Sequence, residues 1–250
     1  MSALVVSDLH IGSHHFLYED FECFLRNVPE DHELILNGDI IDNPYEDLQP
    51  PHKGILELIK QISYRQTVVW VRGNHDNGYK PSELEKVHFK HFHNVKHRLL
   101  IAHGNDFDEI MPINQTFMKA FKWMHNLRVK LGAKPVHVAK YAKKWELFYR
   151  FLRKNVMINA ANCAIENGYE AVTCGHTHYP EDRIFNGIRY INTGAWTEIP
   201  AFYLHVTDNE ITLNSMDHPC YLSSSHFTLP TAITENKIKK ISCIGKIGRV

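Results

Sequence analysis

The residues of this chain best suited to chemistry lie in five short motifs of Asp, Asn, His and Gly. The motifs are Asp8-Leu9-His10, Gly38-Asp39-Ile40-Ile41-Asp42, Gly73-Asn74-His75-Asp76, His103-Gly104 and Gly175-His176-Thr177-His178. Carboxylate, amide and imidazole groups together suit Mn, Fe or Zn better than they suit a thiolate-seeking ion. Two such ions about 3.5–4 Å apart can clamp a phosphoryl group and turn a water molecule into a nucleophile. The motifs therefore predict a metal-dependent hydrolytic site.

Each motif lies at or just beyond the end of a short apolar run that predicts a β-strand. These runs cover residues 3–6, 33–36, 67–71, 98–102 and 171–174. In α/β sheets, ligands bind in the crevice at the carboxyl ends of the strands. Asp8 and His10 are two residues apart, so an extended backbone would project both side chains the same way. Any one motif alone would indicate a turn or a cap, but the ordered set of five predicts one shared site.

Specific roles are expected for four residues within the motifs. One carboxylate can bridge two divalent ions and offset their mutual repulsion, and Asp39 is the candidate for this position. His75 is placed to protonate a leaving oxygen from outside the metal ligands. Asp76 or Asp42 could orient such side chains. We count Asp76 with His75 as the expected catalytic pair.

The elements that position these motifs alternate along the first hundred residues. Helical patterns at 18–26 and 53–62 separate the first three strand runs. This order predicts an α/β fold with parallel strands covered by helices. Further strands are expected at 188–192, 201–206 and 210–214, with Asp208-Asn209 as the hairpin turn between the last two.

A basic helical insert interrupts this alternation at about 112–160. Apolar residues at helical spacing predict one helix from Phe117 to Leu131 and a second from Val138 to Leu152. Lys and Arg are frequent between positions 119 and 154, where Glu146 is the only acid. The insert either covers acyl chains while its basic residues meet phosphates, or packs on the core with its lysines solvated. The candidate substrate-binding residues are Lys140, Tyr141, Lys143, Lys144 and Arg153.

Composition narrows the class of protein. The 28 Lys and Arg balance 28 Asp and Glu, which argues against a protein that coats nucleic acid through bulk charge. A nucleic-acid partner is disfavoured, although the basic and aromatic insert leaves that reading open. No apolar run approaches the roughly 18 residues that span a bilayer, and the N-terminus lacks a signal-peptide layout. Five cysteines without a C-x-x-C pair predict a reduced, cytoplasmic chain.

From Asp8 to about Val206, these motifs resemble those of the calcineurin-like metallophosphoesterase superfamily. The resemblance implies a four-layer α-β-β-α sandwich, with the insert as a helical hairpin, in a domain of residues 1–218 followed by an extension of 219–250. It implies two divalent ions, for which we expect Mn²⁺ first, with Fe or Zn as alternatives. One ion would be held by Asp8, His10, Asp39 and His178, and the other by Asp39, Asn74, His103 and His176. His75 corresponds to the family's general acid or phosphate-stabilising histidine.

Within the superfamily, two segments resemble the branch of UDP-2,3-diacylglucosamine diphosphatases. They are residues 103–108 and 190–196, and the insert lies between the first of them and the Gly-His-Thr-His motif. Tyr141 and Lys143 fall where that branch has a Tyr-x-Lys pattern. The resemblance implies cleavage of a UDP-diacylglucosamine-like nucleotide-sugar lipid to UMP and an acyl-sugar 1-phosphate, as in lipid A biosynthesis. An amphiphilic substrate of this kind implies peripheral contact of the basic insert with the inner membrane face.

Other functions remain open at this stage. Asn105, Ala195 and His75 depart from the branch's usual Asp, Asp and Arg, which would fit a divergent relative with another substrate. A phosphodiesterase or nuclease of the same fold, acting on nucleotides or nucleic acid, is the alternative enzyme. A non-catalytic protein-binding scaffold is the least favoured, because every expected ligand position and His75 are filled.

Overall fold

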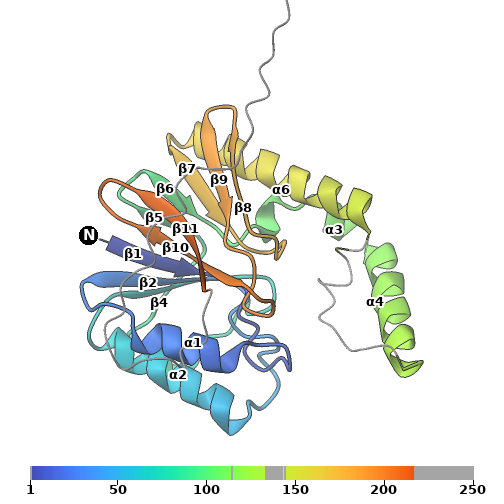
Figure 1. The fold of residues 1–250 in the computed structure, drawn as a ribbon, viewed down its shortest axis with the longest axis horizontal. Helices are drawn as coiled ribbons and strands as arrows, with labels where there is room; N and C mark the ends of the chain where they lie inside the picture. The colour runs from blue at the N-terminus through green and yellow to red at the C-terminus, as the bar shows by residue number, and fades with distance from the viewer. Residues whose placement is uncertain (1, 114, 133–142, 144, 217–250) are drawn as a thin grey trace, which may run out of the picture.

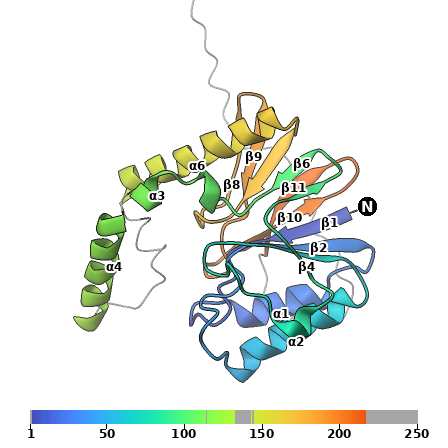
Figure 2. The same cartoon turned by 180° about the vertical axis from the view of Figure 1, so that it is seen from behind.

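Two β-sheets stacked between layers of helices form the body of the protein (Figures 1 and 2). The structure is a computed structural model, and it describes residues 2–113, 115–132, 143 and 145–216. Residues 219–250, the expected extension, lie outside the described residues.

The first sheet brings three of the five motifs to one edge. Its strand order is β11-β10-β1-β2-β3-β4. The strands are β1 (Ser2–Val6), β2 (His32–Asn37), β3 (Val68–Val71), β4 (His88–Lys90), β10 (Ala201–Val206) and β11 (Ile211–Met216). The first four are parallel, and β10 and β11 run antiparallel to their neighbours. The register pairs Val6 with Leu36 and Asn37 with Val71, so β1, β2 and β3 end side by side.

The second sheet brings the other two motifs to the same end of the molecule. Its order is β5-β6-β7-β9-β8. The strands are β5 (His93–Val95), β6 (Leu99–Ile101), β7 (Ala171–Cys174), β9 (Ile188–Asn192) and β8 (Glu181–Phe185). Strands β6, β7 and β9 are parallel, so the residues that follow β6 and β7 are neighbours.

Three apolar clusters hold the layers together. Helices α1 (Tyr18–Arg26) and α2 (Pro50–Ser63) pack on the outer face of the first sheet. The inner faces of the two sheets meet through residues such as Val5, Ile35 and Ile101. Helix α6 (Glu146–Glu166) covers the second sheet. The expected four-layer α-β-β-α arrangement is confirmed.

The insert differs in detail from the expectation. It contains α3 (Ile110–Ile113) and α4 (Gln115–Lys130), and α4 projects away from the sheets (Figures 1 and 2). The second helix was expected at 138–152, but α6 runs from Glu146 to Glu166, and residues 138–142 lie outside the described residues. The extra turns bury Val156, Ala160 and Ala164 against the second sheet. Small alanine side chains give a weak apolar signal in sequence, which hides the length of this helix.

Three strands and a cysteine also depart from the sequence-based expectation. Strands β4 and β5 have three residues each, and β8 is an edge strand with largely exposed side chains, so none of the three carries a clear apolar pattern. Cys23 is disulfide-bonded, so the expectation of a fully reduced chain is wrong at this residue. Sequence spacing does not reveal which sulfurs the fold brings within bonding reach. Among the described residues, no helix is both long and apolar enough to cross a bilayer.

Candidate metal centre

The five motifs meet where the two sheets end, as expected. The Nε2 atoms of His10 and His178 lie 3.2 Å apart, and His178 Nε2 lies 3.2 Å from Asp8 Oδ1. On the other side of Asp8, His103 Nε2 lies 3.2 Å from Asp39 Oδ2. These side chains form two groups that share Asp8, each with its ligand atoms within 4.8 Å of one another.

The backbone at the site is left-handed at five of the expected ligands. The φ angles of Asp8, His10, Asp39, His176 and His178 lie between 51° and 61°. Non-glycine residues rarely adopt this region, and each such residue costs on the order of 1–3 kcal/mol. Asp8 and His10 therefore do not converge through an extended backbone, and that expectation is wrong. They converge because the chain turns sharply after β1, where Asp8 N and His10 N donate to carbonyls of the Gly38-Asp39 turn.

Two glycines are required by the close approach of the ligand side chains. A Cβ atom at Gly175 would lie 2.0 Å from Asp8 Oδ2, and one at Gly73 would lie 2.2 Å from Asp39 Oδ1. Contacts this short do not occur in real structures, so no residue with a side chain fits at either position. Glycine is therefore required by the lack of space at these two positions.

Hydrogen bonds outside the cluster orient the imidazoles. His10 Nδ1 bonds to Asp42 Oδ1 at 2.8 Å, and His103 Nδ1 bonds to the carbonyl of Asn37 at 2.9 Å. Because carboxylate and carbonyl oxygens only accept, each Nδ1 is the donor. The inward Nε2 of a neutral imidazole then presents a lone pair, which at His103 faces the Asp39 carboxylate. Two acceptors that face each other need a cation between them, which is the proton of His103 in the metal-free protein or a bound metal ion, and this outer-oxygen arrangement is typical of metal-binding histidines.

His176 and Asn74 repeat this arrangement at the outer side of the site. His176 Nε2 bonds to Asp108 Oδ2 at 2.9 Å, and its Nδ1 lies 3.0 Å from Asn74 Oδ1. A lone pair on Nδ1 therefore faces an amide oxygen. The residues present fit two divalent ions: one among Asp8, His10, Asp39 and His178, and one among Asp39, Asn74, His103 and His176.

The sequence matches the calcineurin-like phosphoesterase family over residues 1–180, a span that holds all the residues of this site. The chain belongs to this family. It is a metal-binding hydrolase of phosphoester bonds. A comparison with curated proteins finds no match for the phosphoesterase.

Solved structures similar to the phosphoesterase include three with low sequence identity. The zinc complex of Vps29 from Entamoeba histolytica is 12% identical, with a TM-score of 0.47 over 86% of this chain and 91% of that one. Yfce, a phosphoesterase from E. coli, is 16% identical, with a TM-score of 0.43 over 85% and 91%. An archaeal phosphodiesterase is 15% identical, with a TM-score of 0.44 over 86% and 100%. The family assignment comes from the sequence match, and these likenesses add nothing to it.

The electrostatics of the phosphoesterase site favour cations. Burial alone would raise the pKa of Asp8 and Asp39, but the neighbouring imidazoles of His178 and His103 outweigh it and hold both carboxyls below their usual range. Burial alone would lower the pKa of His103, but the carboxylates of Asp39 and Asp8 raise it to about 10. Both carboxylates are therefore ionised at neutral pH, and in the metal-free protein His103 holds the proton that an ion would displace.

The two expected catalytic residues occupy different environments. The His75 ring is partly exposed, its Nδ1 bonds to the Asp42 carbonyl at 2.8 Å, and its centroid lies 4.8 Å from that of His10. Its Nε2 has no hydrogen-bond partner among the described residues. The carboxylate of Asp76 is fully buried and accepts bonds from the backbone of Ile40 and Gly73 and from the Trp70 indole. This placement fits a residue that holds the site loops together.

Two of the expected substrate-binding residues are described, and both pair with carboxylates. Lys143 Nζ lies 2.8 Å from Glu198 Oε1, and Arg153 makes a two-point ion pair with Glu181 at 2.9 and 2.7 Å. Lys140, Tyr141 and Lys144 lie outside the described residues.

Two supporting residues went unassigned in the sequence analysis. Asp108 holds His176, and Asn192 donates to the carbonyl of Gly175 at 2.6 Å and to Thr177 Oγ1 at 3.1 Å. Both lie in the segments that resemble the diphosphatase branch, so the signal that could have found them was already present in 103–108 and 190–196.

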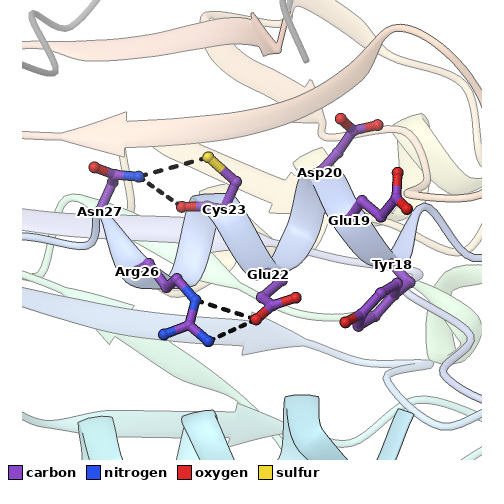
Figure 3. A pocket seen from close by; sticks show the side chains of 7 residues that line it. All are labelled: Tyr18, Glu19, Asp20, Glu22, Cys23, Arg26 and Asn27. Carbon is purple, nitrogen blue, oxygen red and sulfur yellow. Dashed lines mark hydrogen bonds and ion pairs between the residues drawn. The ribbon is translucent and has the colours of Figure 1, made fainter. Parts of the chain in front are cut away.

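A hollow of about 460 Å³ lies along α1, away from the metal centre (Figure 3). Its lining includes Glu19, Asp20 and Glu22, and Glu22 pairs with Arg26 one turn later on the same helix. No residue of the metal centre lines this hollow. Its acidic lining disfavours a phosphorylated substrate.

Proposed function

We propose that the phosphoesterase cleaves the pyrophosphate of a UDP-diacylglucosamine-like nucleotide-sugar lipid, releasing UMP and an acyl-sugar 1-phosphate. The chemistry is a phosphoryl transfer to water, and the expected cofactors are two divalent ions, Mn²⁺ before Fe or Zn. The substrate has a doubly charged phosphate centre and two acyl chains. A suitable enzyme therefore needs an apolar surface connected to its metal centre.

The observation that carries this proposal is the exposed apolar face of the insert. On α4, Trp123 is 66% exposed and Leu127, one turn later, is 39% exposed, and Leu131 just beyond the helix is 79% exposed. On α6, Leu147 and Phe151 are also one turn apart, with 80% and 63% exposure. Basic side chains flank both groups, including the exposed Lys119, Lys130, Arg150 and Lys154. Apolar surface rimmed by positive charge suits acyl chains joined to phosphate, and also an anionic membrane.

Contact between the insert and the metal centre supports the same proposal. The Tyr149 hydroxyl of α6 donates to the carbonyl of Thr177, beside His178. The two segments that resemble the diphosphatase branch also support it, because Asp108 and Asn192 from these segments hold His176 and the loop before His178. An enzyme that binds a lipid and cleaves its phosphate needs a lipid-binding surface in contact with its metal centre.

The residues of the metal centre would have different roles in phosphoryl transfer to water. When bound, the two ions polarise the phosphoryl group and supply a metal-activated water. Asp8, Asp39 and the oriented imidazoles would hold the two positively charged ions in place. His75 keeps its Nδ1–H on the Asp42 carbonyl, so the second proton that its imidazolium form carries on Nε2 is directed away from that bond and can pass to the leaving oxygen.

The partners of this reaction follow from the substrate. The lipid would reside in a membrane, so we expect the insert to contact the inner membrane face peripherally while the sheets remain in the cytoplasm. Nucleic acid is not an expected partner, since the positive charge is concentrated on the insert.

A direct test uses the manganese-loaded protein with UDP-2,3-diacylglucosamine and detects products by mass spectrometry. Release of UMP and acyl-glucosamine phosphate by the wild type, and not by the His75→Ala variant, is the expected result. Failure to cleave this lipid, combined with hydrolysis of bis-p-nitrophenyl phosphate, would reject the substrate and leave a phosphodiesterase of the same fold.

A further inference from the structure

Three side chains of the insert connect it to the loop that carries His178. They are Lys143, Tyr149 and Arg153, and we refer to them as the insert clamp. None of them belongs to the expected ligand sets. Their contacts fall on residues 177–181 and on Glu198.

The insert clamp holds both peptide groups that flank the Cα atom of His178. The Tyr149 hydroxyl donates to the carbonyl of Thr177, which belongs to the peptide before His178. Lys143 Nζ donates to the carbonyl of His178 at 2.6 Å, which belongs to the peptide after it. Fixing both peptide planes fixes φ and ψ of His178, and hence the direction of the Cα–Cβ bond that carries its imidazole.

These two hydrogen bonds are needed because the backbone conformation of His178 is unfavourable. Its φ is 54°, in the left-handed region that residues with a side chain rarely adopt. Such a conformation persists only where the surroundings impose it. From the sheet side, Asn192 holds the carbonyl of Gly175 and the Thr177 hydroxyl. From the insert side, Tyr149 and Lys143 supply the opposing bonds.

Arg153 fixes the next residue along the loop. Its guanidinium lies 3.4 Å from the centre of the Tyr179 ring and pairs at two points with Glu181. The Arg153 and Glu181 side chains are only 13% and 7% exposed, so solvent screens this pair little. Tyr149 also meets the Tyr179 ring edge to face, with centroids 6.1 Å apart. The clamp is therefore continuous from α6 to the residue after His178.

The other metal position has different supports. His103 is held by the carbonyl of Asn37, and His176 by Asp108 and by its backbone bond to Asp8. The contacts of the insert clamp among the described residues do not include these supports. The clamp therefore bears on one of the two expected ion positions, the one formed by Asp8, His10, Asp39 and His178.

We propose that Lys143, Tyr149 and Arg153 are positioning residues that set the affinity of this one ion position, and so couple the insert to half of the metal centre. They act through His178 and contact neither the ions nor the reacting atoms. This inference rests on the two-ion site and does not depend on which phosphoester is the substrate.

Titration of the metal-free protein with Mn²⁺, followed by calorimetry and by electron paramagnetic resonance, tests the proposal. In the Tyr149→Phe variant, which loses only a hydroxyl, we expect one binding step to weaken by about 10- to 100-fold, the range for groups that support a metal ligand. The other step should keep its wild-type affinity. At two equivalents, the signal of a coupled ion pair should give way to that of a single bound ion.

Arg150→Met against Arg153→Met is the matched comparison. Both arginines lie on α6, but Arg150 is exposed and pairs with Glu146 of the same helix. The Arg150 variant should bind both ions like the wild type, and Arg153→Met should weaken one step. Arg153→Lys, which keeps the charge but not the two-point pair, should lie between them.

Two results would overturn the proposal. One is unchanged affinity in both steps for Tyr149→Phe and Arg153→Met. The other is an equal loss in both steps together with a lower melting temperature of the metal-free protein, which would indicate a structural role only. Lys143→Met provides an independent variant if either of the others does not fold. Because the readout is metal binding, a failed lipid assay would leave this result intact.

Discussion

At the scale of single residues, Asp39 is the side chain that we expect the two ion positions to share. It faces His103 Nε2 across 3.2 Å and also accepts a 2.8 Å bond from the backbone of His75. We expect Asp39→Ala to lose both ions and all measurable hydrolysis of bis-p-nitrophenyl phosphate. Asp106→Ala, which removes an exposed carboxylate that pairs with His91, is the control. Full metal content in the Asp39 variant, measured by elemental analysis after dialysis, would exclude a bridging role.

His75 should show a different pattern from Asp39. Its ring makes no bond within the two ligand sets and is directed by the Asp42 carbonyl. We therefore expect His75→Ala to keep two ions while kcat falls by about 10²- to 10⁴-fold, the range for loss of a general acid. Metal content and kcat are measured on the same samples. Loss of an ion in this variant would make His75 a ligand instead of a proton donor.

Glycine 175 gives a test of how tightly the ligands pack. A methyl group there would overlap Asp8 Oδ2 at 2.0 Å, so Gly175→Ala should displace Asp8 and weaken metal binding by at least about 10-fold. Gly54→Ala is a matched control, because Gly54 lies inside α2 with nothing within 4 Å of an added Cβ. That control should keep both ions and gain about 0.5–1 kcal/mol of unfolding free energy. Equal metal affinity in the two variants would contradict the packing argument.

At the scale of elements, most strands and the order of the motifs can be predicted from the sequence, because buried strands of the sheets carry unbroken apolar runs. Strands such as β1 and β7 are buried along nearly their whole length. β8 could not be predicted, since its exposed, charged residues resemble a loop and it forms by pairing with β9. At the metal centre, the residue types were enough to predict the ligands. The left-handed turns that orient these ligands could not be predicted, because they depend on contacts between separate loops.

The exposed apolar face of the insert can be tested for a role in binding acyl chains. If its exposed apolar face receives acyl chains, a Trp123→Ser and Leu131→Ser double variant should raise KM for the lipid substrate at least about 10-fold. Its rate on bis-p-nitrophenyl phosphate should not change, because that substrate has no acyl chain. Ile184→Ser is the matched control, since Ile184 is 78% exposed on β8, outside the insert. The same KM change in the control would show a general effect of surface polarity.

At the scale of the whole molecule, metal binding and pH are linked through His103. The pKa of this imidazole is raised to about 10 in the metal-free protein, so at pH 7 an ion must displace its proton. Mn²⁺ affinity should therefore rise by about tenfold for each pH unit between pH 6.5 and 8.5. Calorimetric titrations in buffers of different ionisation enthalpy would measure the proton released. Affinity independent of pH would contradict the link.

The His103 imidazole also determines whether the stability of the metal-free protein rises or falls with pH. Because folding raises the pKa of His103 above its ordinary value near 6.5, its contribution is full below that pH and is lost as pH rises toward 10. The melting temperature of the metal-free protein should fall over this range. Bound metal should reverse the trend, since free ion at 100 times its Kd adds about 2.7 kcal/mol of stability.

We expect two ions, held by the ligands that follow five strands, to make this chain a phosphoester hydrolase. The most direct test adds Mn²⁺ stepwise to metal-free protein and measures hydrolysis of bis-p-nitrophenyl phosphate at each step. We predict little turnover up to one equivalent, a steep rise between one and two, and a plateau beyond two. Full activity at one equivalent, or none at two, would contradict a dinuclear catalytic centre.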